Sequence, residues 1–421
     1  MGNHIKPAYF TICARNYMAY ALTLRDSLRR IDSDADFFVF LADDAISEPG
    51  FSDFAIPVRA LNIEQESEMG FRYTLMEFST AIKPFCFQYI FDSMGYDAAI
   101  YLDPDIQIFA PLERVEKAIR DGASCVLTPH ILEPLTDEFI PGDRHILQSG
   151  TFNLGFAAFA NQSESRSFLN WWSKQLQTHC LDDLANGLFV DQKFVEFAPC
   201  FLSNLMILRD PGYNVAYWNL SHRPISQNNG TWLAGDVPLV FFHFSGLISK
   251  DPTVFSKHQN RFKPDTAGLA AQLLKEYTGL LINNNHETWQ QQAYVYDRFA
   301  DGTLIPPVMR SDQYLDRPTQ TNFDNPNWNA WNDPCLEVVQ DRGIKITRFM
   351  YAVFLSRPDL QAAFPLTVRT GRKGFHNWFI HNGPSECRAP VRVVNAALED
   401  ETLPMFLARR IKTFLMKFFR R

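Results

Sequence analysis

Short, continuous apolar runs recur through the first 260 residues, and they constrain the fold more than any other feature of the sequence. Phe37–Leu41 reads FFVFL and Ala98–Leu102 reads AAIYL, and aspartates follow each run closely. A strand that is apolar at every position is typical of a parallel sheet covered by helices on both faces. Runs of the same kind are found at Tyr9–Cys13, Ser124–Leu127, Phe156–Phe159, Leu205–Leu208 and Val237–Phe242.

Segments with helical spacing lie between these runs. Ala21, Leu24 and Leu28 share one face of a helix, and Leu112–Arg120 is amphipathic. The alternation of strands and helices predicts an α/β fold with a mostly parallel sheet flanked by helices, in which ligands bind beyond the carboxyl ends of the strands. Further helices are expected at Thr80–Phe91, where Pro84 marks a kink or the first turn, and at Ser165–Gln177.

The length of 421 residues favours two or three domains, and the texture of the sequence changes after about residue 262. We expect the α/β domain to occupy residues 1–265 and a smaller, mainly helical region to occupy residues 266–400. Residues 401–421 are expected to form a basic amphipathic helix.

The basic C-terminal segment stands out against a net charge of −7. Residues 409–421 hold six basic residues and no acidic one, so the rest of the chain is more acidic than the average indicates. Such a helix is typical of a membrane-surface anchor, although a helix docked on the protein body would have the same pattern. The acidic balance argues against nucleic acid as a partner. The apolar stripe of the predicted C-terminal helix would consist of Leu407, Ile411, Phe414, Leu415 and Phe418.

Seven scattered cysteines without a CxxC pair indicate reduced thiols in a cytosolic protein. No stretch approaches the roughly 20 apolar residues of a membrane span, and the first residues lack a signal-peptide core. These features predict a cytoplasmic protein that associates peripherally with the inner face of the plasma membrane through its C-terminal helix.

The clearest candidate site is the sequence Leu102-Asp103-Pro104-Asp105. An apolar strand delivers two carboxylates to its carboxyl end, and oxygen ligands at alternate positions suit Mg²⁺ or Mn²⁺. The same spacing occurs in Asp32, Asp34 and Asp36, which have the character of a solvated turn. The strand before Asp103 therefore carries the metal interpretation, and a strand-end turn is the alternative.

A second candidate site follows the last apolar run, at His243. This histidine could be a buried core residue, or it could complete a metal site with the Asp-x-Asp pair, because imidazole suits Mn²⁺ better than Mg²⁺. Lys250 follows shortly and could neutralise a phosphate, or it could be an ordinary loop lysine.

Two further segments set polar groups within apolar surroundings, where an unpaired amide or carboxylate is costly. One contains Asn153 and Gly155, and the other contains Asp191 and Gln192. These side chains could cap a loop internally or recognise a polyhydroxylated ligand.

The order of these motifs resembles that of retaining glycosyltransferases of family 8 and related bacterial enzymes. The resemblance covers about residues 8–262 and lies in order and spacing rather than in any one motif. Those enzymes have the GT-A fold and use nucleotide-sugar donors with Mn²⁺. The matching motifs are Asn16-Tyr17, Asp103-x-Asp105, Phe152-Asn153-x-Gly155, Asp191-Gln192 and His243-x-x-Gly246.

The resemblance implies roles for these residues. Asp103, Asp105 and His243 would hold Mn²⁺ (or Mg²⁺), with Asp103 also near the donor ribose. Cofactor-binding positions would be Asn16, Tyr17, Lys83, Asp103 and Lys250. Sugar-facing or substrate-binding positions would be Asn153, Gly155, Asp191, Gln192 and Gly246.

The implied reaction moves a sugar from a nucleotide-sugar donor, with UDP favoured, to a saccharide or lipid-linked acceptor in bacterial surface polysaccharide or lipopolysaccharide synthesis. If the anomeric configuration is retained, Gln192 would lie near the anomeric carbon and the leaving phosphate could accept the acceptor proton. If it is inverted, Asp191 is the candidate base. The sequence departs from the family at Cys13-Ala14-Arg15, where an acidic residue is usual, and in the longer spacing from His243 to Lys250.

Three other functional classes are alternatives to a glycosyltransferase. A nucleotidyltransferase typically has a glycine-rich loop after the first strand, and Thr11–Tyr20 contains no glycine. A glycoside hydrolase could use Asp103 and Asp191, but no eight-fold β/α pattern is present. A non-catalytic sugar-binding protein with a GT-A-like fold remains the alternative from a different functional class.

Overall fold

The computed structural model describes residues 6–251, 254–310, 315, 334–341 and 343–398, and these residues form two compact units. The first unit comprises Met1–Met69 and Leu75–Val295, and the second comprises Gly70–Thr74 and Tyr296–Arg421. The division falls after Val295, whereas the sequence analysis placed it at residue 265. A short piece from the first fifth of the chain also belongs to the second unit.

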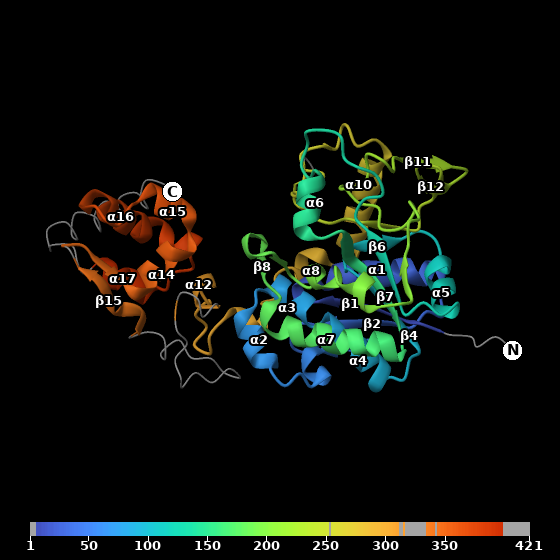
Figure 1. The fold of residues 1–421 in the computed structure, drawn as a ribbon, viewed down its shortest axis with the longest axis horizontal. Coiled ribbons are helices and arrows are strands. Elements are labelled where there is room, and N and C mark those ends of the chain that lie inside the picture. The colour runs from blue at the N-terminus through green and yellow to red at the C-terminus, as the bar shows by residue number, and fades with distance from the viewer. Residues whose placement is uncertain (1–5, 252–253, 311–314, 316–333, 342, 399–421) are drawn as a thin grey trace. The chain divides into compact units, whose positions relative to one another are not determined.

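A seven-stranded sheet forms the centre of the first unit (Figure 1). Its strand order is β10-β6-β7-β4-β1-β2-β3. Neighbouring strands run parallel except at β7, which runs antiparallel to both β4 and β6. The predicted α/β architecture with a mostly parallel sheet is therefore confirmed. The strands are β1 (Ala8–Cys13), β2 (Phe37–Leu41), β3 (Ala55–Pro57), β4 (Ala98–Leu102), β6 (Cys125–Pro129), β7 (Phe152–Ala160) and β10 (Leu205–Ile207).

Apolar side chains cover both faces of this sheet, which explains why its strands are continuous apolar runs. On one face, α1 (Met18–Ile31) and α5 (Glu113–Arg120) contribute to a hydrophobic cluster that includes strand residues. On the other face, α4 (Lys83–Asp92) and α7 (Ser163–His179) pack their aromatic side chains onto the strands. Phe87 of α4 lies 4.8 Å from Phe10 and 4.9 Å from Phe159 between ring centroids. Much of the phenylalanine in the sequence serves this core.

Two predicted elements are divided in the structure. Thr80–Phe91 spans the end of α3 (Leu75–Ala81) and α4, because Pro84 occupies the first turn of the second helix. Val237–Phe242 covers β13 (Val237–Pro238) and the first two residues of β14 (Phe241–His243), and both strands lie outside the main sheet. β14 pairs with β5 (Ile106–Ile108) instead.

The other elements of the first unit include α2 (Glu66–Arg72), α6 (Asp143–Ser149), β8 (Asp182–Asp183), β9 (Leu188–Phe189), α8 (Gln192–Val195), α9 (Ala198–Phe201), β11 (Ile225–Asn228), β12 (Thr231–Ala234), α10 (Leu269–Asn283) and α11 (His286–Trp289).

The second unit is mainly helical in its described part, as the sequence predicts for the C-terminal region. Its core contains Phe349, Phe375 and Phe379, together with Phe71 from the early piece of chain. The buried guanidinium of Arg310 donates hydrogen bonds to the carbonyls of Gly70, Phe71 and Tyr73 at 3.3, 3.0 and 2.8 Å. Its elements are α12 (Pro307–Arg310), β15 (Val338–Asp341), β16 (Lys345–Thr347), α14 (Arg348–Ser356), α15 (Pro358–Ala363), α16 (Arg369–Glu386) and α17 (Val391–Leu398).

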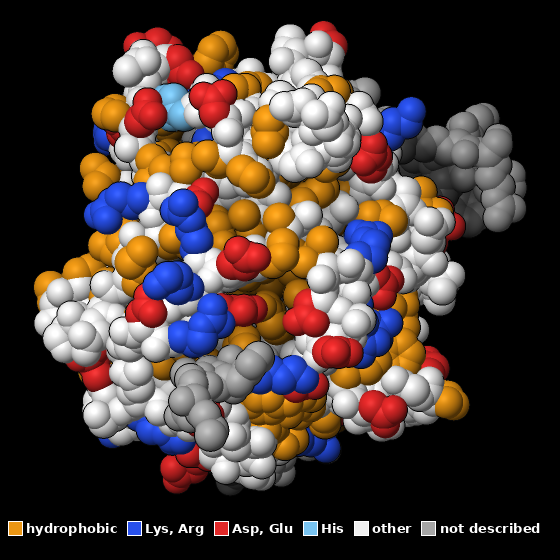
Figure 2. Space-filling view, turned by 90° about the vertical axis from the view of Figure 1, so that its right-hand side faces the viewer, with side chains coloured by type: hydrophobic (Ala, Val, Ile, Leu, Met, Phe, Trp, Pro, Cys, Tyr) orange, Lys and Arg blue, Asp and Glu red, His pale blue; other side chains and the backbone are white. Residues whose placement is uncertain are grey.

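Four further observations concern the surface, the helices, the C-terminal segment and the cysteines. Figure 2 shows one face of the molecule, on which hydrophobic side chains alternate with charged side chains of both signs. None of the helices that the structure describes is both long enough and apolar enough to cross a membrane. The predicted basic helix at 401–421 lies outside the described residues. All seven cysteines are described and free, and only Cys200 is exposed.

Candidate active site

Asp103 and Asp105 lie in a tight turn at the carboxyl end of β4. The amide of Ile106 donates to the carbonyl of Asp103 at 3.1 Å, which closes the turn. Pro104 occupies the second position of the turn, where proline is favoured. The amide of Asp103 donates to the carbonyl of Gly155 at 2.7 Å. The chain then continues as β5, so both carboxylates are held at the edge where β4 ends.

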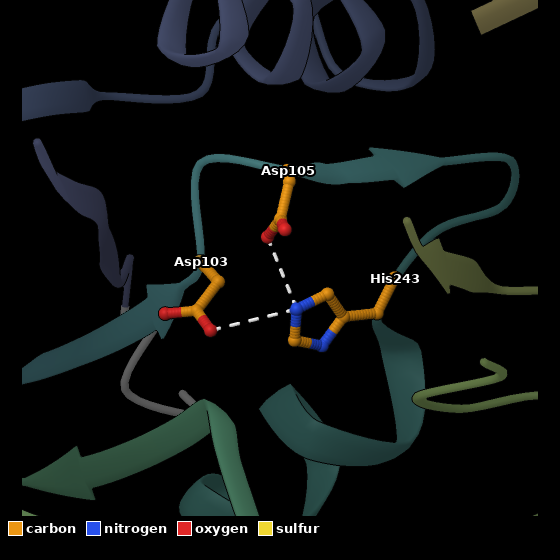
Figure 3. Close-up of side chains that lie close together, drawn as sticks. All are labelled: Asp103, Asp105 and His243. Atoms are coloured by element: carbon orange, nitrogen blue, oxygen red, sulfur yellow. Dashed lines mark ion pairs between the residues drawn. The ribbon is translucent and has the colours of Figure 1, made fainter. Parts of the chain in front are cut away.

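His243, the last residue of β14, lies beside the two aspartates although it is more than 130 residues later in the sequence. β14 runs antiparallel to β5 with His243 opposite Ile106, and the amide of Phe244 donates to the carbonyl of Asp105 at 2.9 Å. The Nε2 atom of His243 lies 3.0 Å from Asp105 Oδ1 and 3.5 Å from Asp103 Oδ2 (Figure 3). Ligand atoms of the three residues all lie within 4.8 Å of one another, so the predicted triad does come together.

The charges at this site are unbalanced in a way that suits a divalent cation. Burial raises the pKa of Asp103, and the neighbouring Asp105 carboxylate raises it further, against Lys83 and His243. Burial lowers the pKa of His243, but the two carboxylates outweigh it and the net shift is upward. Two carboxylate oxygens and one imidazole nitrogen are ligands that Mn²⁺ accepts. The residues present therefore fit such an ion.

Gly155 leaves the space that the His243 ring occupies. A Cβ atom at this position would lie 2.4 Å from Cε1 and 2.6 Å from Nδ1 of His243, and 2.8 Å from Oδ1 of Asn153. Both side chains are buried, so neither can simply swing away. The glycine in this β7 segment is thus required by packing at the site.

We expect Gly155→Ala to weaken metal binding about 10- to 100-fold, because the added methyl group displaces the His243 ring from the two carboxylates, an effect similar to losing a group that orients a metal ligand. Isothermal titration with Mn²⁺ would measure this. Gly279→Ala is the matched control, since Gly279 lies in α10 and a Cβ atom there meets no other atom within 4 Å. Unchanged Mn²⁺ affinity in Gly155→Ala would contradict the prediction.

A second buried cluster lies beside the triad and centres on Lys83. Its Nζ atom is 2.5 Å from Asp191 Oδ2 and donates to the carbonyl of Leu154 at 2.9 Å. The side chains of Lys83 and Asp191 are each only 2% exposed. Burial raises the pKa of Asp191, and the Lys83 ammonium opposes that shift. The two side chains consequently form a desolvated ion pair.

Tyr101 connects the two clusters. Its hydroxyl donates to Asp103 Oδ1 at 2.5 Å, and the Lys83 ammonium lies 4.2 Å from the centre of its ring. Burial, followed by the Asp103 charge, raises the pKa of Tyr101 well above its usual value, so the hydroxyl stays protonated and donates. The tyrosine holds the Asp103 carboxylate and covers the lysine charge at once.

Gln192 and Asn153 fix the start of β7. The Oε1 atom of Gln192 accepts from the Leu154 amide at 2.9 Å, and its Nε2 atom donates to the Ser149 carbonyl at 2.8 Å. The Oδ1 atom of Asn153 accepts from the Gly155 amide and from Asn214 Nδ2 at 3.1 and 3.0 Å. Both side-chain amides are buried and hydrogen-bonded within the protein, as internal capping of a loop requires. They also lie beside the triad.

His130 extends this polar cluster behind the triad. Its Nε2 atom lies 3.0 Å from Asn153 Nδ2, and Trp218 packs edge-on against both His130 and His243 with ring centroids 5.3 Å apart in each case. Burial lowers the pKa of His130 to about 4. The ring is therefore neutral at pH 7 and adds no charge behind the triad.

The predicted nucleotide-binding residues stand in different surroundings. Tyr17 is 39% exposed and stacks on Tyr20 at 4.2 Å, and burial of its hydroxyl raises its pKa, with a contribution from the Asp105 charge. The buried Oδ1 atom of Asn16 has no hydrogen-bond partner within the described part of the chain. Lys250 is exposed, and its charge contributes to the lowered pKa of His286, after burial.

The sequence analysis missed several residues that shape this site. Tyr101 could have been found, because it precedes Asp103 by two positions and so shares its side of the strand. His130 and Asn214 come from other segments and hydrogen-bond Asn153 beside the triad, and Trp218 packs against His243. No local pattern marks them.

Comparison with known proteins identifies distant relatives. No family model matches the sequence. The uncharacterized protein YfnF of Bacillus subtilis (strain 168) is 24% identical over 247 residues, which cover 57% of this chain and 81% of YfnF. The uncharacterized protein YfnD of the same organism is 29% identical over 180 residues, which cover 41% of this chain and 55% of YfnD.

Solved structures similar to this chain include the galactosyltransferase LgtC in complex with donor and acceptor sugar analogues. That similarity has a TM-score of 0.41 at 16% identity and covers 65% of this chain and 95% of LgtC. The glycosyltransferase GlyE of Streptococcus pneumoniae TIGR4 has a TM-score of 0.39 at 16% identity, covering 70% of this chain and 68% of GlyE.

Proposed function

We propose that this protein is a metal-dependent glycosyltransferase with a GT-A fold. It would transfer a sugar from a nucleotide-sugar donor, with a UDP-sugar favoured, to a saccharide or lipid-linked acceptor. The observation that carries the proposal is the convergence of Asp103, Asp105 and His243 at the carboxyl end of β4. Ligands of α/β sheets bind beyond this end of the strands.

The surroundings of the triad support a charged ligand. Asp103, Asp105 and Asp191 bring three carboxylates to neighbouring clusters, and Lys83 is paired to only one of them. A divalent cation and the diphosphate that it binds would balance this charge. Mn²⁺ (or Mg²⁺) held by the triad would stabilise the negative charge that develops on the departing diphosphate.

The chain's own residues would orient the substrates and exclude water. Tyr101 holds the Asp103 carboxylate in place, and Gly155 lets the His243 ring approach. Tyr17 and Asn16 would line the nucleotide pocket, whereas Asn153 and Gln192 fix the backbone on the sugar side. The backbone that Asn153 and Gln192 hold would place the acceptor hydroxyl against the anomeric carbon.

We favour a reaction that retains the anomeric configuration over an inverting reaction with Asp191 as base. Asp191 is buried, and one of its carboxylate oxygens lies 2.5 Å from the Lys83 ammonium. A base that must accept a proton from the acceptor needs an oxygen that the acceptor can reach. The leaving phosphate can take that proton in a retaining reaction.

The same proposal extends to the site of action. A lipid-linked acceptor would give the basic segment 401–421 a purpose, since it would hold the enzyme at an anionic membrane surface on the cytoplasmic side. Bacterial surface polysaccharide or lipopolysaccharide synthesis is the kind of pathway that uses such acceptors.

A thermal-shift panel tests the proposal directly. UDP, GDP, ADP, CDP and dTDP would each be added with Mn²⁺ and then with excess EDTA. We expect one nucleotide, with UDP favoured, to raise the melting temperature by several degrees at saturating concentration, and EDTA to remove the effect, because a ligand that binds only the folded state stabilises it. Equal shifts with all five nucleotides, or none with any, would contradict the proposal and favour a non-catalytic protein.

A further inference from the structure

The chain that follows β14 returns to Gly246 and places the side chain of His258 against it. Gly246, three residues after His243, has a φ of +76°. A Cβ atom there would lie 2.5 Å from His258 Cδ2, 2.5 Å from Ser256 Oγ and 3.3 Å from His258 Nε2. The imidazole of His258 therefore lies directly against the backbone of Gly246.

The segment that carries His258 is anchored on both sides. Before it, Ser256 Oγ donates to the Ser245 carbonyl at 2.8 Å, and the Lys257 amide donates to the Gly246 carbonyl at 3.0 Å. After it, the side chain of Arg261 forms two 2.7 Å hydrogen bonds with the Asp137 carboxylate. An exposed side chain between two such anchors is held in place rather than free to sweep through solvent.

A row of aromatic rings links His258 to the triad. Its ring centroid is 6.2 Å from that of Tyr217, which is 4.9 Å from Trp218, which in turn is 5.3 Å from His243. Burial and the Lys257 charge lower the pKa of His258, and the Asp105 carboxylate opposes that shift. The neutral ring retains one N–H group that can donate.

We propose that His258 is a ligand-contacting residue for the diphosphate of a nucleoside diphosphate, donating a hydrogen bond to the phosphate farther from the nucleoside. This inference rests on the function proposed above and adds a residue to its site. His258 is exposed, so a ligand can reach it, and its ring lies against Gly246, three residues after His243. Phosphate oxygens are strong acceptors for a fixed donor of this kind.

The role differs from the one suggested for Lys250. Lys250 is exposed, and its charge acts on His286, which hydrogen-bonds Ser249 and packs against Tyr20. His258 instead contacts Gly246, which lies three residues after the triad histidine in the sequence. The two residues would approach the ligand from different places, so the inference about His258 does not depend on Lys250.

The test compares ligands that differ by one phosphate. Wild type, His258→Ala and His258→Gln would be titrated calorimetrically, in the presence of Mn²⁺, with UDP and with UMP, or with the corresponding pair for the nucleotide found in the panel above. We expect His258→Ala to weaken diphosphate binding about tenfold and monophosphate binding less than about twofold, since one hydrogen bond to a charged acceptor is lost. His258→Gln keeps a donor and should recover part of the affinity.

Two controls separate this contact from a structural role. His179→Ala removes an exposed histidine at the end of α7 and should change neither affinity. Titration with Mn²⁺ alone should give the same affinity for His258→Ala as for wild type. An unchanged diphosphate affinity in His258→Ala, or equal losses for both nucleotides, would overturn the inference. If wild type binds no nucleoside diphosphate with Mn²⁺, the proposed function fails and this inference fails with it.

Discussion

Asp105→Asn is expected to lower kcat/KM for sugar transfer about 1000-fold while leaving the fold intact. The substitution keeps the size of the side chain but removes the charge nearest to His243 Nε2, which lies 3.0 Å away. A metal ion supplies several kcal/mol of charge stabilisation to such reactions, and ~4 kcal/mol corresponds to about three orders of magnitude in rate. The rate would be measured with the nucleotide-sugar whose nucleotide stabilises the protein.

The fold should tolerate this change because Asp105 is itself a cause of the raised pKa of Asp103. Removing one of two neighbouring carboxylates relieves repulsion, so the melting temperature should stay within a few degrees of wild type. Asp34→Asn is the matched control, since Asp34 belongs to the other Asp-x-Asp run and is exposed. Equal activity of Asp105→Asn and Asp34→Asn would contradict a metal-dependent reaction at this site.

Lys83→Met is expected to destabilise the first unit by about 3–5 kcal/mol, the cost of leaving one member of a buried ion pair without its partner. Lys83 and Asp191 are each 2% exposed, and the lysine also donates to the Leu154 carbonyl. For a unit of this size, the melting temperature should fall by roughly 10 °C. Differential scanning calorimetry would measure the change.

A double-substitution cycle shows whether the pair is the cause. Lys83→Met combined with Asp191→Asn removes both charges, so it should lose less stability than the two single changes together. Lys174→Met replaces an exposed lysine on α7 and should alter the free energy of unfolding by no more than about 0.5 kcal/mol. A Lys83→Met variant as stable as Lys174→Met would show that the ion pair contributes nothing.

The strands and the places of Asp103 and Asp105 could be predicted from the sequence because their causes are local. Phe37–Leu41 and Ala98–Leu102 match β2 and β4, since a strand covered on both faces is apolar at every position. Asp103 and Asp105 follow such a strand, and strand ends meet at one edge of the sheet. The sequence pattern is sufficient wherever burial and the strand end decide the outcome.

The direction of β7 could not be predicted, because hydrophobicity carries no direction. All nine of its residues are buried, which is compatible with a parallel or an antiparallel strand. Its polar start is also compatible with a loop. The side chain of Asn153 has its polar partners in His130 and Asn214, which are distant in the sequence, so no local pattern shows that it can be buried in a strand. The burial of Lys83 likewise depends on Asp191, more than one hundred residues away.

The composition of the second unit has a consequence for anyone who shortens the gene. Gly70–Thr74 belongs to that unit, and Phe71 lies in its core. A gene that stops at codon 295 would encode the whole seven-stranded sheet but would leave the Phe71 ring without the side chains that cover it. A gene that starts at codon 296 would leave the Arg310 guanidinium without three of its carbonyl acceptors. Neither half is a complete folding unit, so a graft or fusion must carry both stretches of the chain.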